Sequence, residues 1–192
     1  MKSFTTDFRF VQTEKPLSKD IFDRCYIYVF FVRYKDVNTH NKCRLKYVCR
    51  AEIYGEVCAI KFYASRDRKS DYDKYSLAHS QLPYSAIMKI FDYCITVMKE
   101  IMIKFPEVSF VFKGAEAYDP RTHRQEDEKE NQRFRIYRSY LSKRVGTKTF
   151  QHSQFPDNSI YLLTNISGFE DIEDKQNRLR EFLSDRFGIP LS

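Results

Sequence analysis

One long amphipathic pattern, from residue 85 to residue 105, constrains the fold of this chain more than any other feature. Apolar residues recur there at a spacing near i, i+3, i+4 and i+7 for about five turns, and they include Ile87, Ile90, Phe91, Cys94, Val97, Met98, Ile101 and Phe105. Because this apolar face is wide, we expect most of the helix to lie buried against a sheet. Pro106 follows directly and cannot donate the hydrogen bond that a further turn needs.

Three short runs rich in β-branched and aromatic residues precede this helix. They span residues 24–34, 44–54 and 57–65, and each has the length and composition of a strand. The two-residue link Gly55-Glu56 suits a hairpin closed by a type II′ turn. We therefore expect an antiparallel meander of three strands. The charged stretch from 66 to 81 has no period of a packed element and is predicted to be an exposed loop.

The chain after the long helix alternates between the two types of element. We expect a strand at 108–112, a charged loop at 118–132, a helix at 131–144, strands at 148–152 and 159–164, and a helix at 168–188. This order predicts an α+β fold: a mixed, largely antiparallel sheet with the long helix packed on it, an Arg-rich helix and a C-terminal helix. We expect residues 1–167 to form one domain and residues 168–192 to be a helical appendage.

Bulk properties narrow the compartment and the partners. The 192 residues carry 33 Lys+Arg and 26 Asp+Glu, so the formal net charge is +7. This surplus suits an anionic ligand, an acidic protein surface or nucleic acid. The five cysteines are odd in number and lie mostly in apolar runs, and no apolar run reaches the ~20 residues that cross a bilayer, so we expect a cytoplasmic protein with no membrane contact. Neither Cys-x-x-Cys nor His-Glu-x-x-His occurs, so no metal site is expected.

The order of elements over residues 44–164 resembles the GNAT acetyltransferase fold, in which a hairpin leads into the helix that lines the coenzyme A site. Asn131, Phe134 and Tyr137 resemble that family's Asn-x-x-Ala pattern and its helical tyrosine. The resemblance implies acetyl-CoA as cofactor and Tyr137 as the general acid. The family's glycine-rich pyrophosphate loop is absent, because residues 76–86 contain no glycine. Gln81 and Ser85 are the side-chain donors that remain there.

The helix at 131–144 carries the most unusual local chemistry. Phe134, Tyr137 and Leu141 share one face, and a basic stripe lies beside it. Our leading hypothesis is a GNAT-like domain without a cofactor that binds an anionic ligand or an acidic partner through arginines, because guanidinium groups bind carboxylate and phosphate with two parallel hydrogen bonds. The candidate ligand-binding residues are Arg121, Arg124, Arg133, Arg135, Arg138 and Arg144.

Three other interpretations remain open at this point. The arginines can simply pair with the neighbouring acidic residues, from Glu126 to Glu130, on a solvated helix. The chain can be an N-acyltransferase that uses acetyl-CoA and Tyr137. It can also be a nucleic-acid-binding module that uses the same helix, with an affinity that falls steeply with salt. The sequence leaves the oligomeric state open.

Overall fold

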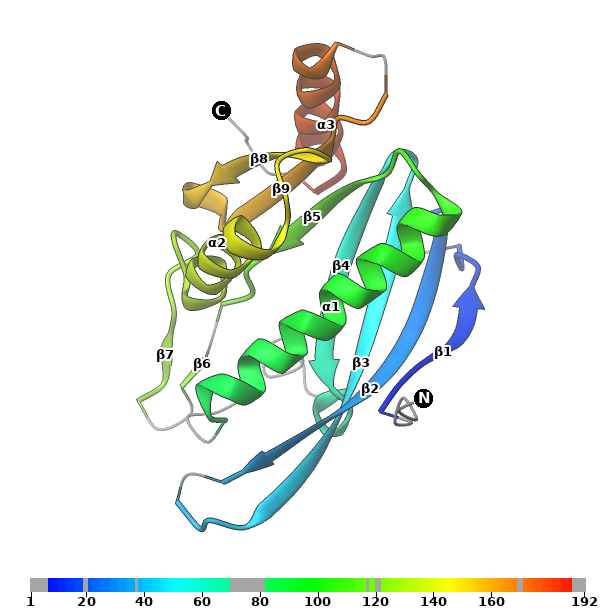
Figure 1. Ribbon diagram of the computed structural model, residues 1–192. Helices are drawn as coiled ribbons and strands as arrows, with labels where there is room; N and C mark the ends of the chain where they lie inside the picture. Colours follow the sequence, from blue (N-terminus) through cyan, green and yellow to red (C-terminus); the bar gives the residue numbers. More distant parts are fainter. Residues whose placement is uncertain are drawn as a thin grey trace.

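A seven-stranded sheet organises the part of the chain that the computed structural model describes, which is residues 7–18, 21–36, 38–69, 82–116, 118–119, 122–168 and 171–187. The strands are β1 (Phe8–Glu14), β2 (Arg24–Lys35), β3 (Lys42–Tyr54), β4 (Val57–Ala64), β5 (Ser109–Lys113), β8 (Phe150–Phe155) and β9 (Ile160–Asn165). Their order across the sheet is β1-β2-β3-β4-β5-β9-β8 (Figure 1). Only the β4–β5 pair is parallel. The predicted α+β fold with a mixed, largely antiparallel sheet is thus confirmed.

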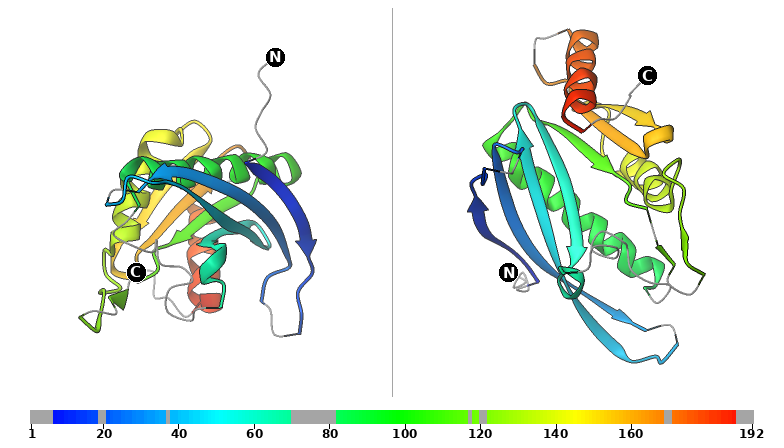
Figure 2. Two further views of the ribbon diagram at one scale, coloured as in Figure 1. Left: turned by 90° about the horizontal axis from the view of Figure 1, so that it is seen from below. Right: turned by 180° about the vertical axis from the view of Figure 1, so that it is seen from behind.

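Helices cover both faces of this sheet. Helices α1 (Tyr84–Lys104) and α2 (Gln132–Arg144) lie on one face, and α3 (Ile172–Phe187) lies on the other (Figure 2). The first face contributes Phe62, Phe91 and Tyr137 to a large apolar cluster. The second contributes a smaller cluster that includes Leu179 and Leu183 of α3. Alternate residues of each central strand enter the two clusters, as the period of two along a strand requires.

The strongest sequence signals predicted elements that the structure contains. Six of the residues that the periodicity selects are buried in α1, namely Ile90, Phe91, Cys94, Val97, Met98 and Ile101. Ala86 is buried as well but was not selected, and the selected Ile87 and Phe105 are only partly buried. At the hairpin, Gly55 has a φ of +56°. Glu56 is not among the described residues with a positive φ. A positive φ at the first loop residue alone is the mark of a type II′ turn, so this prediction is confirmed.

Where the sequence pattern is weaker, some elements were missed and some bounds were predicted wrongly. Strand β1 was not predicted, because it is an edge strand with five of its seven residues exposed and has little apolar pattern. The charged stretch predicted as a loop at 118–132 contains a two-stranded ribbon of β6 (Tyr118–Asp119) and β7 (Arg124–Gln125). Strand β8 begins at Phe150 rather than 148 and continues to Phe155. A 3-10 turn, Ser65–Asp67, lies where the predicted strand 57–65 meets the predicted loop 66–81, and residues 70–81 of that loop lie outside the described residues.

The C-terminal helix packs against the sheet through a short apolar stripe. Leu179 and Leu183 are 1% exposed and join the cluster that contains Val111 and Ile160. Lys175 Nζ donates to the backbone oxygen of Glu107 at 3.4 Å. The division of the chain at residue 168 stays a prediction. Among the described helices, none combines the length and the apolar character that a membrane crossing requires.

Candidate anion-binding site

A cleft opens in the middle of the sheet, where the parallel strands β4 and β5 separate. The two strands pair from Val57 with Ser109 to Ala59 with Val111, and the ladder ends there. Strand β4 continues to Ala64, and β5 turns instead toward β9. Beyond the last pair lies a pocket of about 280 Å³. It is lined by Ala59, Ile60, Lys61, Phe62, Val111, Lys113, Gly114, Ala115, Glu116, Arg133, Tyr137, Ile160 and Leu183.

The walls of this pocket come from both layers of the molecule. Ile60 and Phe62 belong to the apolar cluster under α1 and α2. Val111, Ile160 and Leu183 belong to the cluster under α3. The pocket is therefore a gap through the sheet with mainly aliphatic and aromatic walls, which is the usual character of a small-molecule site.

The start of α2 is fixed to the end of β5 by the Asn131 side chain. Its Oδ1 accepts from the backbone N–H of Phe134 at 2.9 Å and caps the helix. Its Nδ2 donates to the backbone oxygen of Gly114 at 2.8 Å. A Cβ on Gly114 would lie 2.2 Å from Asn131 Oδ1, so this close approach requires glycine. These contacts aim the first turns of α2 at the pocket.

Arg133 lies one turn before Tyr137 on the face of α2 that lines the pocket. The residue is 5% exposed, and its Nε and Nη2 atoms have no hydrogen-bond partner among the described residues. Its Cζ lies 4.8 Å from the centroid of the Phe62 ring, a cation–π distance. Burial raises the pKa of Tyr137 to about 12, and the nearby Arg133 charge opposes that rise. The guanidinium is thus a buried positive charge next to an aromatic wall.

The other charged side chains that line the pocket have partners. Lys61 Nζ lies 2.7 Å from Glu52 Oε2. Lys113 Nζ lies 3.0 Å from Glu128 Oε1. Glu116 accepts a hydrogen bond from the side-chain amide of Gln125. Of the three described cations that line the pocket, Arg133 alone has no ion pair within 4.0 Å.

Two predicted ligand-binding arginines lie instead on the outer side of α2. Arg135 Nη1 donates to the backbone oxygen of Glu130 at 2.5 Å, and its Nη2 lies 3.9 Å from Glu126 Oε1. Arg138 Nη1 lies 2.7 Å from Glu130 Oε1. The alternative in which these arginines pair with neighbouring acidic residues therefore describes these two positions. A role of either in ligand binding stays a prediction.

The remaining predicted residues do not gather at one place. Arg144 is exposed at the end of α2, with its Cζ 5.6 Å from the centroid of the Tyr140 ring. Arg124 is exposed on the ribbon strand β7, and Ser85 is exposed in the first turn of α1. Among the predicted residues that the structure describes, only Arg133 and Tyr137 line the pocket. Arg121 and Gln81 lie outside the described residues.

The sequence contained a signal that separates Arg133 from the other arginines. Arg133, Tyr137 and Leu141 follow one another at intervals of four and lie on the buried stripe of α2. An arginine on an apolar stripe is unusual, since charged residues are almost never fully buried unless paired. The strand residues that complete the pocket, such as Ile60 and Ile160, carry no comparable signal.

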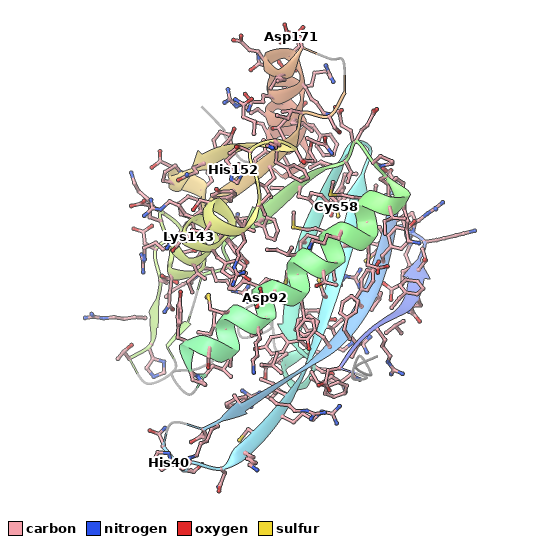
Figure 3. The ribbon with its side chains drawn as sticks, viewed as in Figure 1. His40, Cys58, Asp92, Lys143, His152 and Asp171 are labelled. Carbon is pink, nitrogen blue, oxygen red and sulfur yellow. The ribbon has the colours of Figure 1, made fainter. Side chains whose placement is uncertain are left out.

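A second hollow lies beside β8 and β9 and is larger and more open. Its volume is about 490 Å³, and it is lined in part by His152 and Tyr161. His152 Nδ1 is 2.7 Å from the Tyr161 hydroxyl, and burial lowers the pKa of His152, against a smaller opposing effect of the Val145 backbone. His152 is drawn on β8 in Figure 3.

No metal site accompanies the pocket within the described chain, where no group of three or more His, Cys, Asp or Glu side chains lies close enough to hold an ion. The five cysteines are free thiols, and four of them are buried. Comparison with known proteins gives no match to a family model, to a curated protein or to a solved structure.

Proposed function

We propose that this chain binds a small anionic ligand in the cleft between β4 and β5, with Arg133 as the residue that holds the negative charge. The observation that carries this proposal is the buried Arg133 side chain, which lines a pocket with apolar walls and has two guanidinium nitrogens without a hydrogen-bond partner among the described residues. The proposal narrows the arginine surface predicted from the sequence to one side chain that faces inward.

The physical argument rests on the cost of an unpaired charge. A guanidinium stays charged in a protein, and burial without a partner costs several kcal/mol even after local relaxation. The contact with Phe62 offsets about 0.5–2 kcal/mol of that cost. A carboxylate or phosphate oxygen pair would satisfy these two nitrogens together once the guanidinium turns them toward the pocket, because the guanidinium fork matches that geometry.

The test is a thermal-unfolding screen of the wild-type chain and Arg133→Gln with phosphate, ATP, acetyl-CoA, hexanoate and a short oligonucleotide. A ligand at 100 times its Kd adds about 2.7 kcal/mol to the free energy of unfolding, which is a rise in Tm of about 5–10 °C for a chain of this size. We expect at least one small anion to stabilise the wild type and not Arg133→Gln. Arg135→Gln is the matched control on the outer side of α2 and should respond as the wild type does.

A second candidate function is N-acyl transfer from acetyl-CoA, as the resemblance to the GNAT fold implies. It is favoured by the position of Tyr137, which lines the cleft between two parallel strands from the helix that follows them. With a pKa raised to about 12, the phenol is protonated at neutral pH. In the proposed step a neutral amine nitrogen forms the new C–N bond, the C–S bond breaks, and the phenol proton passes to the leaving thiolate. The proton that the amine nitrogen loses then returns to the phenolate through solvent, so that the phenol is restored.

This second candidate is tested by acetyl-CoA turnover with a panel of primary amines. We expect Tyr137→Phe to lower kcat at least 100-fold with little change in the melting temperature. If acetyl-CoA neither binds nor turns over, this candidate function is wrong. The anion site is then tested by the thermal-unfolding screen alone.

A further inference from the structure

We infer that the ligand of the Arg133 pocket is a monocarboxylic acid with an apolar body, such as a short alkanoate, rather than a phosphate or a nucleotide. This inference rests on the proposed function and specifies the chemistry of the same site. It follows from the charge count of the lining, from the nature and size of the walls, and from the carboxylate at the edge of the pocket.

The first step is the charge that the pocket leaves uncompensated. Lys61 is paired with Glu52, and Lys113 is paired with Glu128. Arg133 is the remaining cation among the described lining residues. Glu116 lies in the same lining and accepts from the neutral Gln125 amide, so the lining holds one unpaired guanidinium and one carboxylate and has no surplus of positive charge. A ligand with a single carboxylate needs only the guanidinium as its partner, whereas a triphosphate or a diphosphate would bring several charges into apolar surroundings with no further partners.

The second step is the character and size of the walls. Apart from the charged residues, the lining is aliphatic or aromatic, with Ile60, Val111, Ile160 and Leu183 facing the same space as the Phe62 ring. A volume of about 280 Å³ corresponds to roughly nine water molecules at ~30 Å³ each. Such a space is of the right size for a short hydrocarbon body.

The third step is the carboxylate of Glu116, which lines the pocket but forms no ion pair with Arg133 within 4.0 Å. It accepts from the neutral Gln125 amide, so its charge is not cancelled by that partner. A negative charge at this position repels a second anionic group on a ligand. Glu116 therefore selects against dianions, which makes it a specificity-determining residue of the pocket.

The experiment measures Kd by isothermal titration calorimetry for four matched ligands: hexanoate, hexanamide, adipate and propionate. Hexanamide keeps the shape without the charge, adipate adds a second carboxylate, and propionate shortens the body. We expect hexanoate to bind at least tenfold more tightly than hexanamide or adipate. Each methylene removed should weaken binding by about fourfold, the equivalent of ~0.8 kcal/mol.

Variants of Arg133 and Glu116 separate the binding of the carboxylate from the selection against a second negative charge. Arg133→Gln should make hexanoate and hexanamide bind equally, and Arg133→Lys, which keeps the charge without the fork, should lie between it and the wild type. Glu116→Gln should tighten the binding of adipate at least threefold more than it tightens the binding of hexanoate, because adipate brings two negative charges near this position. Arg138→Gln is the control with an arginine removed from the outer side. Each variant is first checked for a wild-type unfolding transition.

The outcomes distinguish the inference from the function on which it rests. If phosphate or ATP binds more tightly than hexanoate in an Arg133-dependent way, the proposed function stands and the monocarboxylic acid is overturned. The monocarboxylic acid is also overturned if hexanoate, hexanamide and propionate bind alike. If none of the anions binds in an Arg133-dependent way, the proposed function itself fails.

Discussion

Replacement of Arg133 by methionine should make the ligand-free protein more stable. Methionine has a similar length and no polar hydrogen, so Arg133→Met removes a buried charge without opening a large void. Arg133 is 5% exposed, and two of its guanidinium nitrogens have no hydrogen-bond partner among the described residues. A core position that serves stability alone would favour the apolar residue, so a gain from this change would show that Arg133 serves a ligand.

The magnitude follows from two opposing contributions. Replacement of buried ionic groups by well-packed apolar residues is worth up to about 1–4 kcal/mol. Loss of the contact with the Phe62 ring, whose centroid is 4.8 Å from Arg133 Cζ, costs about 0.5–2 kcal/mol. The expected net gain is about 1–2 kcal/mol, which raises Tm by roughly 2–8 °C in a chain of this length.

The assay is differential scanning calorimetry together with urea unfolding, on protein dialysed free of small anions. Arg138→Met is the control, because its partner Glu130 is at the surface and the change should stay within about 0.5 kcal/mol. A loss of more than about 1 kcal/mol in Arg133→Met would refute the reasoning, since it would mean that the guanidinium is satisfied in the ligand-free fold.

Three further changes test the supports of the site. Gly114→Ala should lower the free energy of unfolding in urea by about 2–4 kcal/mol. The new Cβ would clash with the side-chain amide of Asn131, which two hydrogen bonds hold in place. A variant as stable as the wild type would show that this amide can move aside. Tyr140→Phe should cost about 1–2 kcal/mol in urea unfolding, because the Tyr140 hydroxyl donates to Asp92 and joins α2 to α1. Asp92 is labelled on α1 in Figure 3. An unchanged urea midpoint would show that this hydrogen bond does not stabilise the fold. Burial lowers the pKa of His152, so the unfolded state binds more protons than the folded state as the pH falls through about 6.5, and the free energy of unfolding decreases there. His152→Gln should therefore lose less free energy of unfolding than the wild type between pH 7.5 and 5.5. Equal losses in the two proteins would contradict this origin of the pH dependence.

Local signals were strong enough to predict most elements. The apolar face of α1 and its end before Pro106 follow from the 3.6-residue period and from proline chemistry. The hairpin at Gly55 follows from the conformation that only glycine adopts cheaply. Strand β1 was not predicted, because an exposed edge strand is held by backbone hydrogen bonds that almost any sequence can form.

The candidate site was also predicted only in part from the sequence. The sequence placed Arg133 and Tyr137 on one helix and marked the helix as basic. The four-residue spacing of Arg133, Tyr137 and Leu141 indicates an inward arginine, but the prediction did not use it to separate Arg133 from the paired arginines beside it. The pocket depends on contacts between residues far apart in the chain. Ile60, Val111, Ile160 and Leu183 meet there because β4 and β5 part after three paired residues.

The sequence by itself therefore determined the kinds of element, their order and the basic character of α2, since these depend on neighbours within a few residues. The tertiary structure alone decided where the parallel strands separate, which arginine is buried, and which charges cancel. The reason is physical: a periodic pattern is a local property, whereas a cavity and an unpaired charge are defined by every group that surrounds them.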